Sequence, residues 1–375
     1  MMIPPAVALG LELRVLAETE GSSAGLAATA VGDYRDAATV LAFARGVDVV
    51  TFDHEHVPQE VLAELVAAGV AVHPGPEALA VARDKILMRR RLSELGAPIP
   101  AWAVVTDAGE LAAFLAEQGG RAVVKTPRGG YDGKGVRVVT RPEEVADWFA
   151  EAGASAEGAD GSPAGLLAEA FVPFRRELAQ QVARRPSGQV VAWPLVETVQ
   201  RDGVCAEVTA PAPGAEASAP GSTGDLAARA EALATRIAEG LGVTGALAVE
   251  LFETAEGELL VNELAMRPHN SGHWSIDGAV TSQFEQHLRA VADLPLGDPA
   301  PTAAWSVMVN VLGGPSGQTM LDRYPAAMAA QPAAKLHSYD KSSRPGRKVG
   351  HVTVTGDDLE SVRAQARAAA AFFQG

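Results

Sequence analysis

The sequence is poor in the features that mark disulfide-linked, nucleic-acid-binding and membrane proteins. It holds one cysteine, Cys205, which excludes an internal disulfide and suits a reducing compartment. Positive charge is scarce: 31 Lys and Arg stand against 46 Asp and Glu, and the net charge of −15 argues against a nucleic acid or an anionic membrane as partner. No apolar run approaches the length of a membrane span, and the N-terminus lacks the order of a signal peptide. We therefore expect a soluble, cytoplasmic protein.

What is present is ordinary for a globular chain, with 47% apolar and 21% charged residues. The length of 375 residues allows two or three domains with real cores. Between residues 5 and 80, Ala- and Leu-rich stretches alternate with short apolar runs at 47–52 and 70–73, which predicts βα units and a parallel sheet. Further strands are expected at 103–105, 122–125, 136–139, 178–183, 190–196, 246–252 and 259–265, helices at 5–20, 77–95 and 357–373, and surface loops at 151–165 and 211–224.

A glycine-rich loop at 128–135 lies between two of these strands. Four glycines in its last seven positions let backbone N–H groups approach a ligand closely, as a phosphate cradle requires. Lys125, at the end of the preceding strand, can supply a point charge to phosphates. A flexible β-hairpin is an equally good interpretation, because Asp-Gly is a common hairpin turn. The loop is not of the Walker type, since no Gly-Lys-Ser/Thr follows at the required spacing and no helix opens after it.

Two glutamates lie on neighbouring strand candidates, at 246–252 and 259–263. If Glu256 and Gly257 form the hairpin loop, the register places Glu250 opposite Glu263. Like charges directly opposite each other destabilise a sheet, and a bound cation reverses the sign of that effect. Carboxylate oxygens of this kind suit Mg²⁺. The alternative is that one glutamate points to solvent, which a one-residue slip in register would produce.

A basic cluster stands out in this acidic chain. The segment 339–351 carries four cations within eight residues: Lys341, Arg344, Arg347 and Lys348. A charge run of this kind is usually a solvated turn. The functional alternative is an anion pocket, because Pro-Gly fixes a turn that can present Arg and Lys together to a phosphate.

The most informative run follows the second glutamate strand. It reads Asn-Glu-Leu-Ala-Met-Arg-Pro-His-Asn-Ser-Gly-His-Trp from Asn262 to Trp274, more polarity than a buried strand would carry. The run resembles the signature of the 5-(carboxyamino)imidazole ribonucleotide synthase family, whose members are ATP-grasp ligases of purine biosynthesis. Met266 stands where that family commonly has proline. The glycine-rich loop and the Arg-Pro-Gly-Arg-Lys-Val-Gly-His segment ending at His351 resemble the same family.

The resemblance implies an α/β and α+β architecture: an ATP-grasp fold with a Rossmann-like N-terminal domain and a small C-terminal domain. The expected domains are 1–85, 86–295 and 296–375, with a lid over about 104–168 and a catalytic core over about 169–295. The implied reaction carboxylates 5-aminoimidazole ribonucleotide with bicarbonate, driven by ATP. The implied metal is Mg²⁺, with Mn²⁺ as the alternative ion, and the implied assembly is a homodimer.

The resemblance also assigns residues. Mg²⁺ would be held by Glu250 and Glu263. Nucleotide contacts fall on Lys85, Lys125, Gly130, Tyr131, Asp132, Gly133, Lys134, Gly135, Glu169, Ala170, Phe171, Val172, Glu177, Asn262 and Glu263. Within that set, Glu169 would accept from the adenine amine and Glu177 would hold the ribose hydroxyls. The catalytic residues would be Tyr131, Asp132, Lys134, His269, Asn270 and Ser271. The ribonucleotide would meet Glu55, Lys341, Arg344, Arg347 and Lys348.

The family's opening strand and glycine loop have no match here, because Met1 to Ala6 correspond to the helix that follows them. We therefore expect a longer natural protein, since losing an interior strand would leave neighbours unpaired. Two other functions remain open. One is a different ATP-grasp carboxylate or formate ligase, and the other is a nucleotide-binding protein without catalysis.

Overall fold

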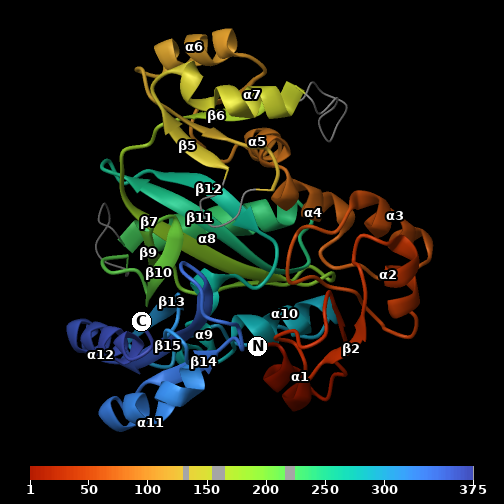
Figure 1. Ribbon diagram of the computed structural model, residues 1–375, viewed down its shortest axis with the longest axis vertical. Helices are drawn as coiled ribbons and strands as arrows, with labels where there is room; N and C mark the ends of the chain where they lie inside the picture. The colour runs from red at the N-terminus through yellow and green to blue at the C-terminus, as the bar shows by residue number, and fades with distance from the viewer. Residues whose placement is uncertain (130–134, 154–164, 216–223, 375) are drawn as a thin grey trace.

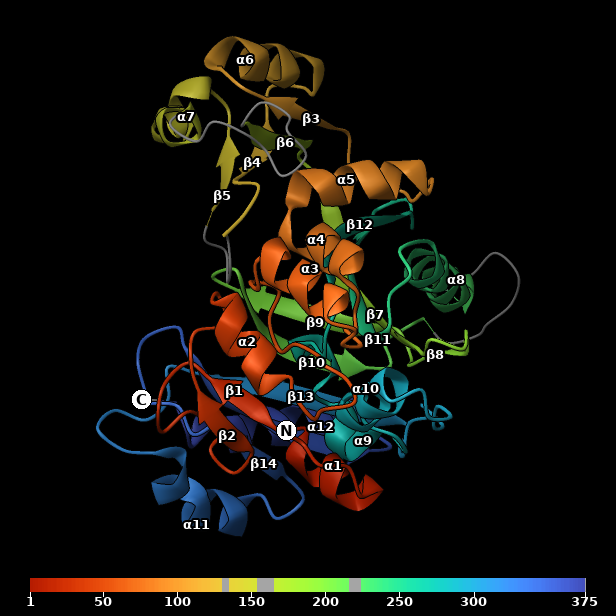
Figure 2. The same ribbon diagram turned by 90° about the vertical axis from the view of Figure 1, so that its right-hand side faces the viewer.

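The computed structural model describes residues 1–129, 135–153, 165–215 and 224–374, and the chain forms four connected parts in it (Figures 1 and 2). The first part is sparse in sheet. Its elements are α1 (Ile3–Leu9), β1 (Val15–Ala17), β2 (Ala28–Val31), α2 (Ala37–Phe43) and α3 (Gln59–Ala67). The parallel pair β1–β2 and a single bridge between Val50 and Val72 are the strand pairing described here.

The predicted helix 5–20 is wrong, because α1 ends at Gly10, whose φ of 69° is left-handed, and a strand follows. The predicted strand 47–52 shrinks to the bridge at Val50. The apolar face of this part is instead buried by α2 and α3, around Val40, Val61 and Leu65. A short apolar run can therefore supply core without extending a sheet.

A helical pair leads from this part into the lid. The predicted helix 77–95 is two helices, α4 (Pro76–Arg83) and α5 (Lys85–Glu94). Asp84 separates them with an extended backbone, and its side chain accepts from the N–H groups of Ile86 and Leu87, both at 3.0 Å. Asp84 therefore caps α5, and a new helix axis begins at Lys85.

The lid is a four-stranded sheet in the order β3-β6-β4-β5, at the top of Figure 1. Two helices and a 3₁₀ turn pack on it around Leu111, Phe114, Val124 and Leu166. Its elements are β3 (Trp102–Val105), α6 (Ala108–Glu117), β4 (Ala122–Lys125), β5 (Val136–Val139), η1 (Pro142–Val145), α7 (Ala146–Gly153) and β6 (Leu166–Ala170). The three predicted lid strands match β3, β4 and β5, whereas the predicted loop from 151 begins inside α7.

The catalytic core and the C-terminal part share one nine-stranded sheet, ordered β12-β11-β7-β9-β10-β13-β15-β14 with β8 beside β7. The core strands are β7 (Phe174–Arg184), β8 (Val190–Ala192), β9 (Val196–Arg201), β10 (Val204–Ala210), β11 (Gly245–Thr254) and β12 (Leu259–Ala265). Helix α8 (Gly224–Gly240) covers one face and α10 (Gln283–Val291) lies on the other, against β11 and β7. The short η2 (Asn270–Gly272) and α9 (Ser275–Gly278) connect β12 to α10.

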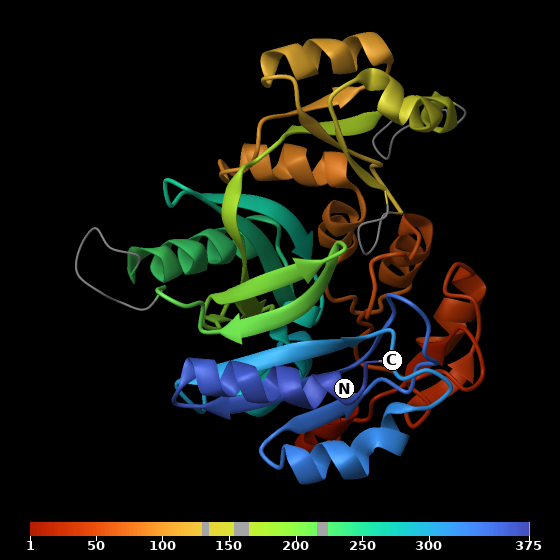
Figure 3. The same ribbon diagram turned by 60° about the vertical axis from the view of Figure 1, so that its left-hand side comes forward.

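The C-terminal part continues the sheet through the β10–β13 pairing rather than standing apart. Its strands are β13 (Trp305–Leu312), β14 (Lys335–Ser338) and β15 (Lys348–Gly356), and its helices are α11 (Met320–Ala330) and α12 (Leu359–Ala371). Figure 3 shows α12, in dark blue, alongside β13 and β15. None of the helices in the described ranges is both long and apolar enough to cross a membrane.

Candidate active site

The acidic pair lies on β11 and β12, and Glu250 is paired with Glu263 as predicted. The predicted turn length and the predicted regular register are both wrong, and the two errors offset each other. The turn is one residue longer than expected, because the N–H of Thr254 donates to the Glu258 carbonyl at 2.9 Å and encloses three residues. Counting from that turn alone would place Asn262 opposite Glu250. A bulge at Asn262 restores the pairing, since Leu251 is already opposite Val261.

The bulge brings Asn262 and Glu263 together beside Glu250, so that the two carboxyls face each other across the strands. Burial, together with the neighbouring Glu263 and Glu177 carboxylates, raises the pKa of Glu250 to about 8. Burial raises the pKa of Glu177, on β7, to about 7. The raised pKa values show that ionisation of these carboxyls is unfavourable here, and a bound cation would make it favourable. No cage of three or more His, Cys, Asp or Glu ligands occurs in the described ranges, so a metal here would need further oxygens from a nucleotide.

Lys125 stands at the end of β4 within a buried charge network. Its Nζ donates to Glu169 Oε2 at 2.7 Å and to Asn262 Oδ1 at 3.2 Å. Arg89, on α5, binds the other oxygen of Glu169 and donates to the Asn262 carbonyl at 2.6 Å. Arg89 and Glu169 are 1% and 3% exposed, so three charges are held together almost without water. Arg89 was not predicted, because a cation inside a helix pattern carries no distinguishing signal.

This network bears on the expected adenine contacts. Both Glu169 oxygens already accept from cations, and an adenine amine would have to compete with them. The Ala170 N–H donates to the Ala101 carbonyl at 2.8 Å, so it is not available to a ligand. The guanidinium of Arg121 lies 3.7 Å from the centre of the Phe171 ring, and the Val172 carbonyl accepts from the Phe174 N–H. In the hinge 169–172, these groups already have partners within the protein.

The base of the glycine loop is anchored at α5. Lys85 has its Nζ 3.9 Å from Glu263 Oε1, and its N–H donates to the Pro127 carbonyl. Arg128 pairs with the capping Asp84 at 2.8 Å. The Thr126 N–H donates to the carbonyl of Gly135, which closes the loop. The predicted residues Gly130, Tyr131, Asp132, Gly133 and Lys134 lie outside the described residues.

The signature run begins beside the acidic pair. His269 Nε2 lies 3.4 Å from Glu250 Oε1, and Nδ1 lies 2.9 Å from Ser271 Oγ. Burial, and then the cations Arg267 and Lys348, hold the pKa of His269 well below its usual value. The ring is therefore neutral near pH 7.

The two residues after His269 face inward. Asn270 exchanges amide hydrogen bonds with Asn310 of β13, at 3.1 and 2.6 Å, and is 9% exposed. Ser271 is 1% exposed. Of the three predicted catalytic residues in this run, only His269 therefore presents its side chain to the acidic pair. Asn310 was missed because nothing distinguishes one amide in an apolar strand.

The cation cluster splits between the site and the surface. Lys348, at the start of β15, lies close enough to contribute to the lowered pKa of both His269 and His273. Arg347 donates to the Ser342 hydroxyl at 2.8 Å, and Lys341 lies 5.6 Å from the centre of the Tyr339 ring. Arg344 is exposed, and its carbonyl accepts from the Arg347 N–H. The turn orders its own side chains, with Lys341 and Arg344 exposed and Arg347 and Lys348 half-buried.

Glu55 is the one predicted site residue from the N-terminal part. It forms an ion pair with Arg267 at 2.9 Å, and both side chains are less than a fifth exposed. The pair ties residues 54–56 to the signature run. Arg267 stood in the quoted motif but was not predicted as a site residue.

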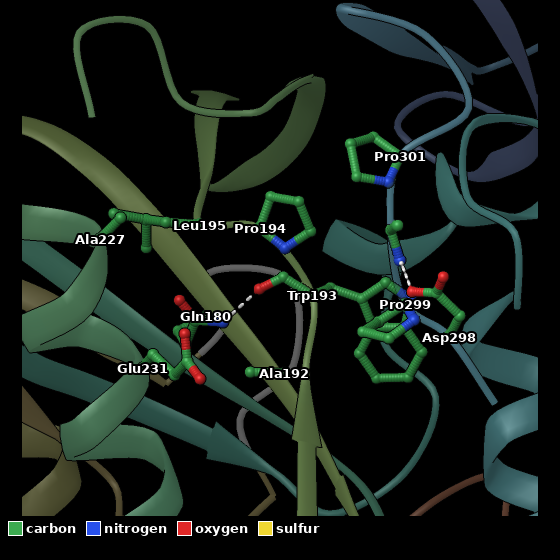
Figure 4. A pocket seen from close by; sticks show the side chains of 11 residues that line it. Gln180, Ala192, Trp193, Pro194, Leu195, Ala227, Glu231, Asp298, Pro299 and Pro301 are labelled. Carbon is green, nitrogen blue, oxygen red and sulfur yellow. Dashed lines mark hydrogen bonds between the residues drawn. The ribbon is translucent and has the colours of Figure 1, made fainter. Parts of the chain in front are cut away.

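A cavity of about 290 Å³ lies elsewhere, between β7, α8 and the link 298–301 (Figure 4). Trp193, Pro194 and Pro299 line it together with the polar side chains of Gln180, Glu231 and Asp298. Gln180 donates to the Trp193 carbonyl at its wall. It contains none of the predicted site residues, so the polar cluster at β11–β12 is the better candidate for chemistry.

Comparison with protein families gives three matches that follow one another along the chain. Residues 1–83 match the ribonucleotide synthetase preATP-grasp domain, 90–284 the ATP-grasp domain, and 306–365 the phosphoribosylaminoimidazole carboxylase C-terminal domain. N5-carboxyaminoimidazole ribonucleotide synthase of Mycobacterium tuberculosis is 48% identical over 369 residues, covering 97% of this chain and 83% of that protein.

Solved structures agree. N5-carboxyaminoimidazole ribonucleotide synthetase from Thermus thermophilus superposes with a TM-score of 0.84 at 37% identity, covering 99% of this chain and 95% of that one. The Aspergillus clavatus enzyme, solved with ADP and 5-aminoimidazole ribonucleotide, gives 0.85 at 28% identity, covering 99% and 94%. Such coverage does not support the expectation of a missing first strand. The chain belongs to the N5-carboxyaminoimidazole ribonucleotide synthase family of ATP-grasp enzymes, which carboxylate 5-aminoimidazole ribonucleotide in purine biosynthesis.

Proposed function

We propose that the cleft between β11–β12 and the lid performs this family's reaction, in which 5-aminoimidazole ribonucleotide, bicarbonate and ATP give N5-carboxyaminoimidazole ribonucleotide, ADP and phosphate. The observation that carries the proposal is the Glu250–Glu263 pair with cations on two sides. Lys85 and Lys125 lie toward the lid, and Lys348, near the neutral His269, lies toward the signature run. One acidic centre thus separates a site for a triphosphate from a site for a small anion.

The donor set fits Mg²⁺, and Mn²⁺ is the alternative ion. Glu250 and Glu263 would hold the metal, with Asn262 close by, and the positive charge of the ion would offset the burial that raises the pKa of Glu250. When bound, the ion supplies positive charge to the β- and γ-phosphates. The two glutamates are therefore expected to act as one unit.

In the first half-reaction a bicarbonate oxygen bonds to the γ-phosphorus, the bond to the β–γ bridging oxygen breaks, and ADP leaves. Carboxyphosphate is the product. Lys125 and Lys85 offset the charge that accumulates on the phosphates, and the buried Arg89 and Glu169 hold Lys125 in place. Positioning and electrostatic stabilisation supply most of the rate in such a step.

In the second half-reaction the exocyclic amine forms the new C–N bond to the carboxyl carbon of carboxyphosphate, or of CO₂ released from it. The C–O bond to phosphate breaks and the amine loses a proton, for which Asp132 is the proposed acceptor. His269 donates to the anion from Nε2, while Arg267 and Lys348 add positive charge. Asn270 and Ser271 shape the wall from behind.

The ends of the two substrates would be held at the margins of the cleft. On the nucleotide side we propose Glu177 for the ribose hydroxyls and the loop containing Tyr131 and Lys134 for the phosphates. On the other side, Lys341, Arg347 and Lys348 would bind the ribonucleotide phosphate, with Arg344 at the rim. A homodimer is the assembly we propose, and sedimentation equilibrium would test it.

The test is ADP release that depends on both 5-aminoimidazole ribonucleotide and bicarbonate. Glu263→Gln keeps the shape and removes the charge, so turnover should fall by about 100-fold or more with the fold intact. Glu256→Gln, an exposed carboxyl in the turn of the same hairpin, is the matched control and should stay near wild type. A folded Glu263→Gln protein with near-normal turnover would exclude this metal site, and ADP release with formate or another acceptor instead would exclude this substrate.

A further inference from the structure

A chain of buried amides runs behind the signature histidine and takes no part in the proposed chemistry. Gln181 lies on β7 and Gln283 is the first residue of α10, and they are 4% and 1% exposed. Both contact the segment 269–273, which Gln181 precedes and Gln283 follows in the chain. Buried amides are usually kept for a specific hydrogen-bond pattern, because an unpaired one is costly.

The orientation of Gln283 is set by the backbone of His269. Its Oε1 accepts from the His269 N–H at 2.9 Å, and its Nε2 donates to the His269 carbonyl at 2.8 Å. Because the backbone groups cannot exchange roles, the oxygen and nitrogen of this side chain are settled. The same Nε2 lies 2.7 Å from Nδ1 of His273, which must therefore accept.

Gln283 in turn orients Gln181. The Gln181 Nε2 lies 3.4 Å from Gln283 Oε1, and only an N–H group can face that acceptor. The same Nε2 lies 3.4 Å from Ser271 Oγ, so the serine oxygen accepts there. A β-carbon on Gly272 would overlap the Gln181 amide, so the glycine in this position is what lets the amide reach Ser271.

The direction of donation then passes to His269. The Ser271 N–H donates to His269 Nδ1 at 3.4 Å, so that nitrogen is an acceptor. The Ser271 hydroxyl, whose oxygen accepts from Gln181, therefore donates its own hydrogen to Nδ1, 2.9 Å away. Nδ1 is thus the bare nitrogen and Nε2 carries the hydrogen. Nε2 faces Glu250 Oε1 at 3.4 Å, toward the centre of the cleft.

We propose that Gln283 and Gln181 are positioning residues that, through Ser271, hold His269 as the Nε2–H tautomer. The inference rests on the proposed function, in which an anion formed from bicarbonate lies next to His269. A hydrogen on Nε2 attracts that anion, whereas the other tautomer would turn a lone pair toward it. Fixing the tautomer through a neighbouring group removes the need to select it during each turnover.

The main test is Gln181→Glu, measured at a pH high enough to ionise the buried carboxyl, where it keeps the shape but presents only acceptors to Ser271. The Ser271 hydroxyl should then donate to the new carboxylate, and the hydrogen of His269 should move to Nδ1. We expect kcat to fall by about 10- to 100-fold, with the KM for ATP within about twofold. The ¹⁵N resonances of the His269 ring, identified by their loss in His269→Asn, should exchange their protonated and bare assignments.

Gln180→Glu is the matched control. Gln180 is the neighbouring residue on the same strand, is equally buried, and donates to the Trp193 carbonyl on the other side of the sheet (Figure 4). It should cost as much stability as Gln181→Glu, yet leave kcat and the His269 resonances near wild type. Equal kcat losses in the two variants, or an unchanged His269 tautomer in Gln181→Glu, would overturn the proposal.

Ser271→Ala covers the case in which a buried carboxylate prevents folding. It removes the hydroxyl donor without adding charge, and it should give mixed protonation of the His269 ring together with a loss in kcat. An unchanged ring spectrum with unchanged kcat would contradict the proposal. If wild-type protein fails to carboxylate 5-aminoimidazole ribonucleotide, the proposed function fails, whereas the ring spectra still report on the tautomer.

Discussion

The two sides of the cleft hold their positive charge in opposite ways. Toward the lid, Lys125 is fixed by Glu169, which Arg89 binds from the other side, and all three are buried. Toward the C-terminal part, Arg347 is half-buried and contacts its own turn, and Lys341 and Arg344 are exposed. The first arrangement is preorganised and expensive to disturb, whereas the second can reorganise around a ligand. The first suits the proposed phosphoryl transfer, and the second suits the proposed binding of the ribonucleotide phosphate.

Breaking the buried side should have the largest effect. Arg89→Met leaves Glu169 with one partner inside the protein, so the free energy of unfolding should fall by about 3–5 kcal/mol. The KM for ATP should also rise, because Glu169, which binds Lys125, is then no longer held by Arg89. Arg91→Met is the control on the same helix, where an exposed pair with Glu94 is worth about 0–1 kcal/mol. Denaturant titrations compare the two, and equal losses would show that Arg89 adds no more than a surface cation.

The acidic pair, proposed to hold the metal, offers the next largest effect. Glu250→Gln and Glu263→Gln should each lower kcat by about 100-fold, equivalent to about 2.7 kcal/mol. The double variant should be little worse than either single one, because the two carboxylates act as one site. Independent contributions, with losses that multiply, would contradict a shared ion. Steady-state ADP release at saturating ATP makes the comparison.

The pairing of Glu250 with Glu263 could be predicted only in part from the sequence. The spacing of Glu250 and Glu263 predicts their pairing, but only because a longer turn and the bulge at Asn262 offset each other. Both features depend on packing of the whole sheet, which local spacing does not encode. The lid strands were predictable from apolar runs between turn residues, whereas α1 and β1 were not, since an Ala- and Leu-rich stretch fits either element.

The missed site residues share a physical reason. Arg89, Asn310 and Gln283 act through partners that are 80, 40 and 14 residues away in the chain. Each lies within a regular element, where one polar residue looks like any solvent-facing position. The resemblance located the cleft, but only the tertiary contacts show that Asn270 and Ser271 face inward. The roles expected for residues 130–134, which lie outside the described ranges, remain predictions.

A buried histidine gives an effect of intermediate size that depends on pH. His287 Nδ1 accepts from the Ala246 N–H and its Nε2 donates to Thr51, which joins the N-terminal part to the core. Burial lowers the pKa of His287 to about 4. Because the unfolded chain then binds the extra proton first, stability is full above the ordinary pKa of 6.5 and falls as pH drops toward 4.

The loss between pH 7 and 5 should be about 2 kcal/mol from this group alone. Thermal unfolding of wild type and His287→Gln over that range measures it, because the variant should show a shallower dependence while starting from a lower stability. An identical slope in both proteins would mean that other groups carry the acid sensitivity. His337→Gln is the control, since that ring is already paired with Asp277 at 2.7 Å.

The smallest effect is expected on the exposed side. Lys341→Ala and Arg347→Ala should each raise the KM for 5-aminoimidazole ribonucleotide by about 10-fold, or about 1.4 kcal/mol, with kcat and the KM for ATP nearly unchanged. The reason is distance: the turn contacts itself and Tyr339, whereas the nucleotide side is built from the lid and β11–β12. Lys335→Ala, which removes an exposed lysine on β14, should change neither constant.

A salt series sharpens this test. Because charges that face solvent are screened by salt, raising the salt concentration should raise the wild-type KM for 5-aminoimidazole ribonucleotide toward the values of the variants. A parallel rise in the KM for ATP would show that the turn serves the triphosphate, and would remove the contrast between the two sides.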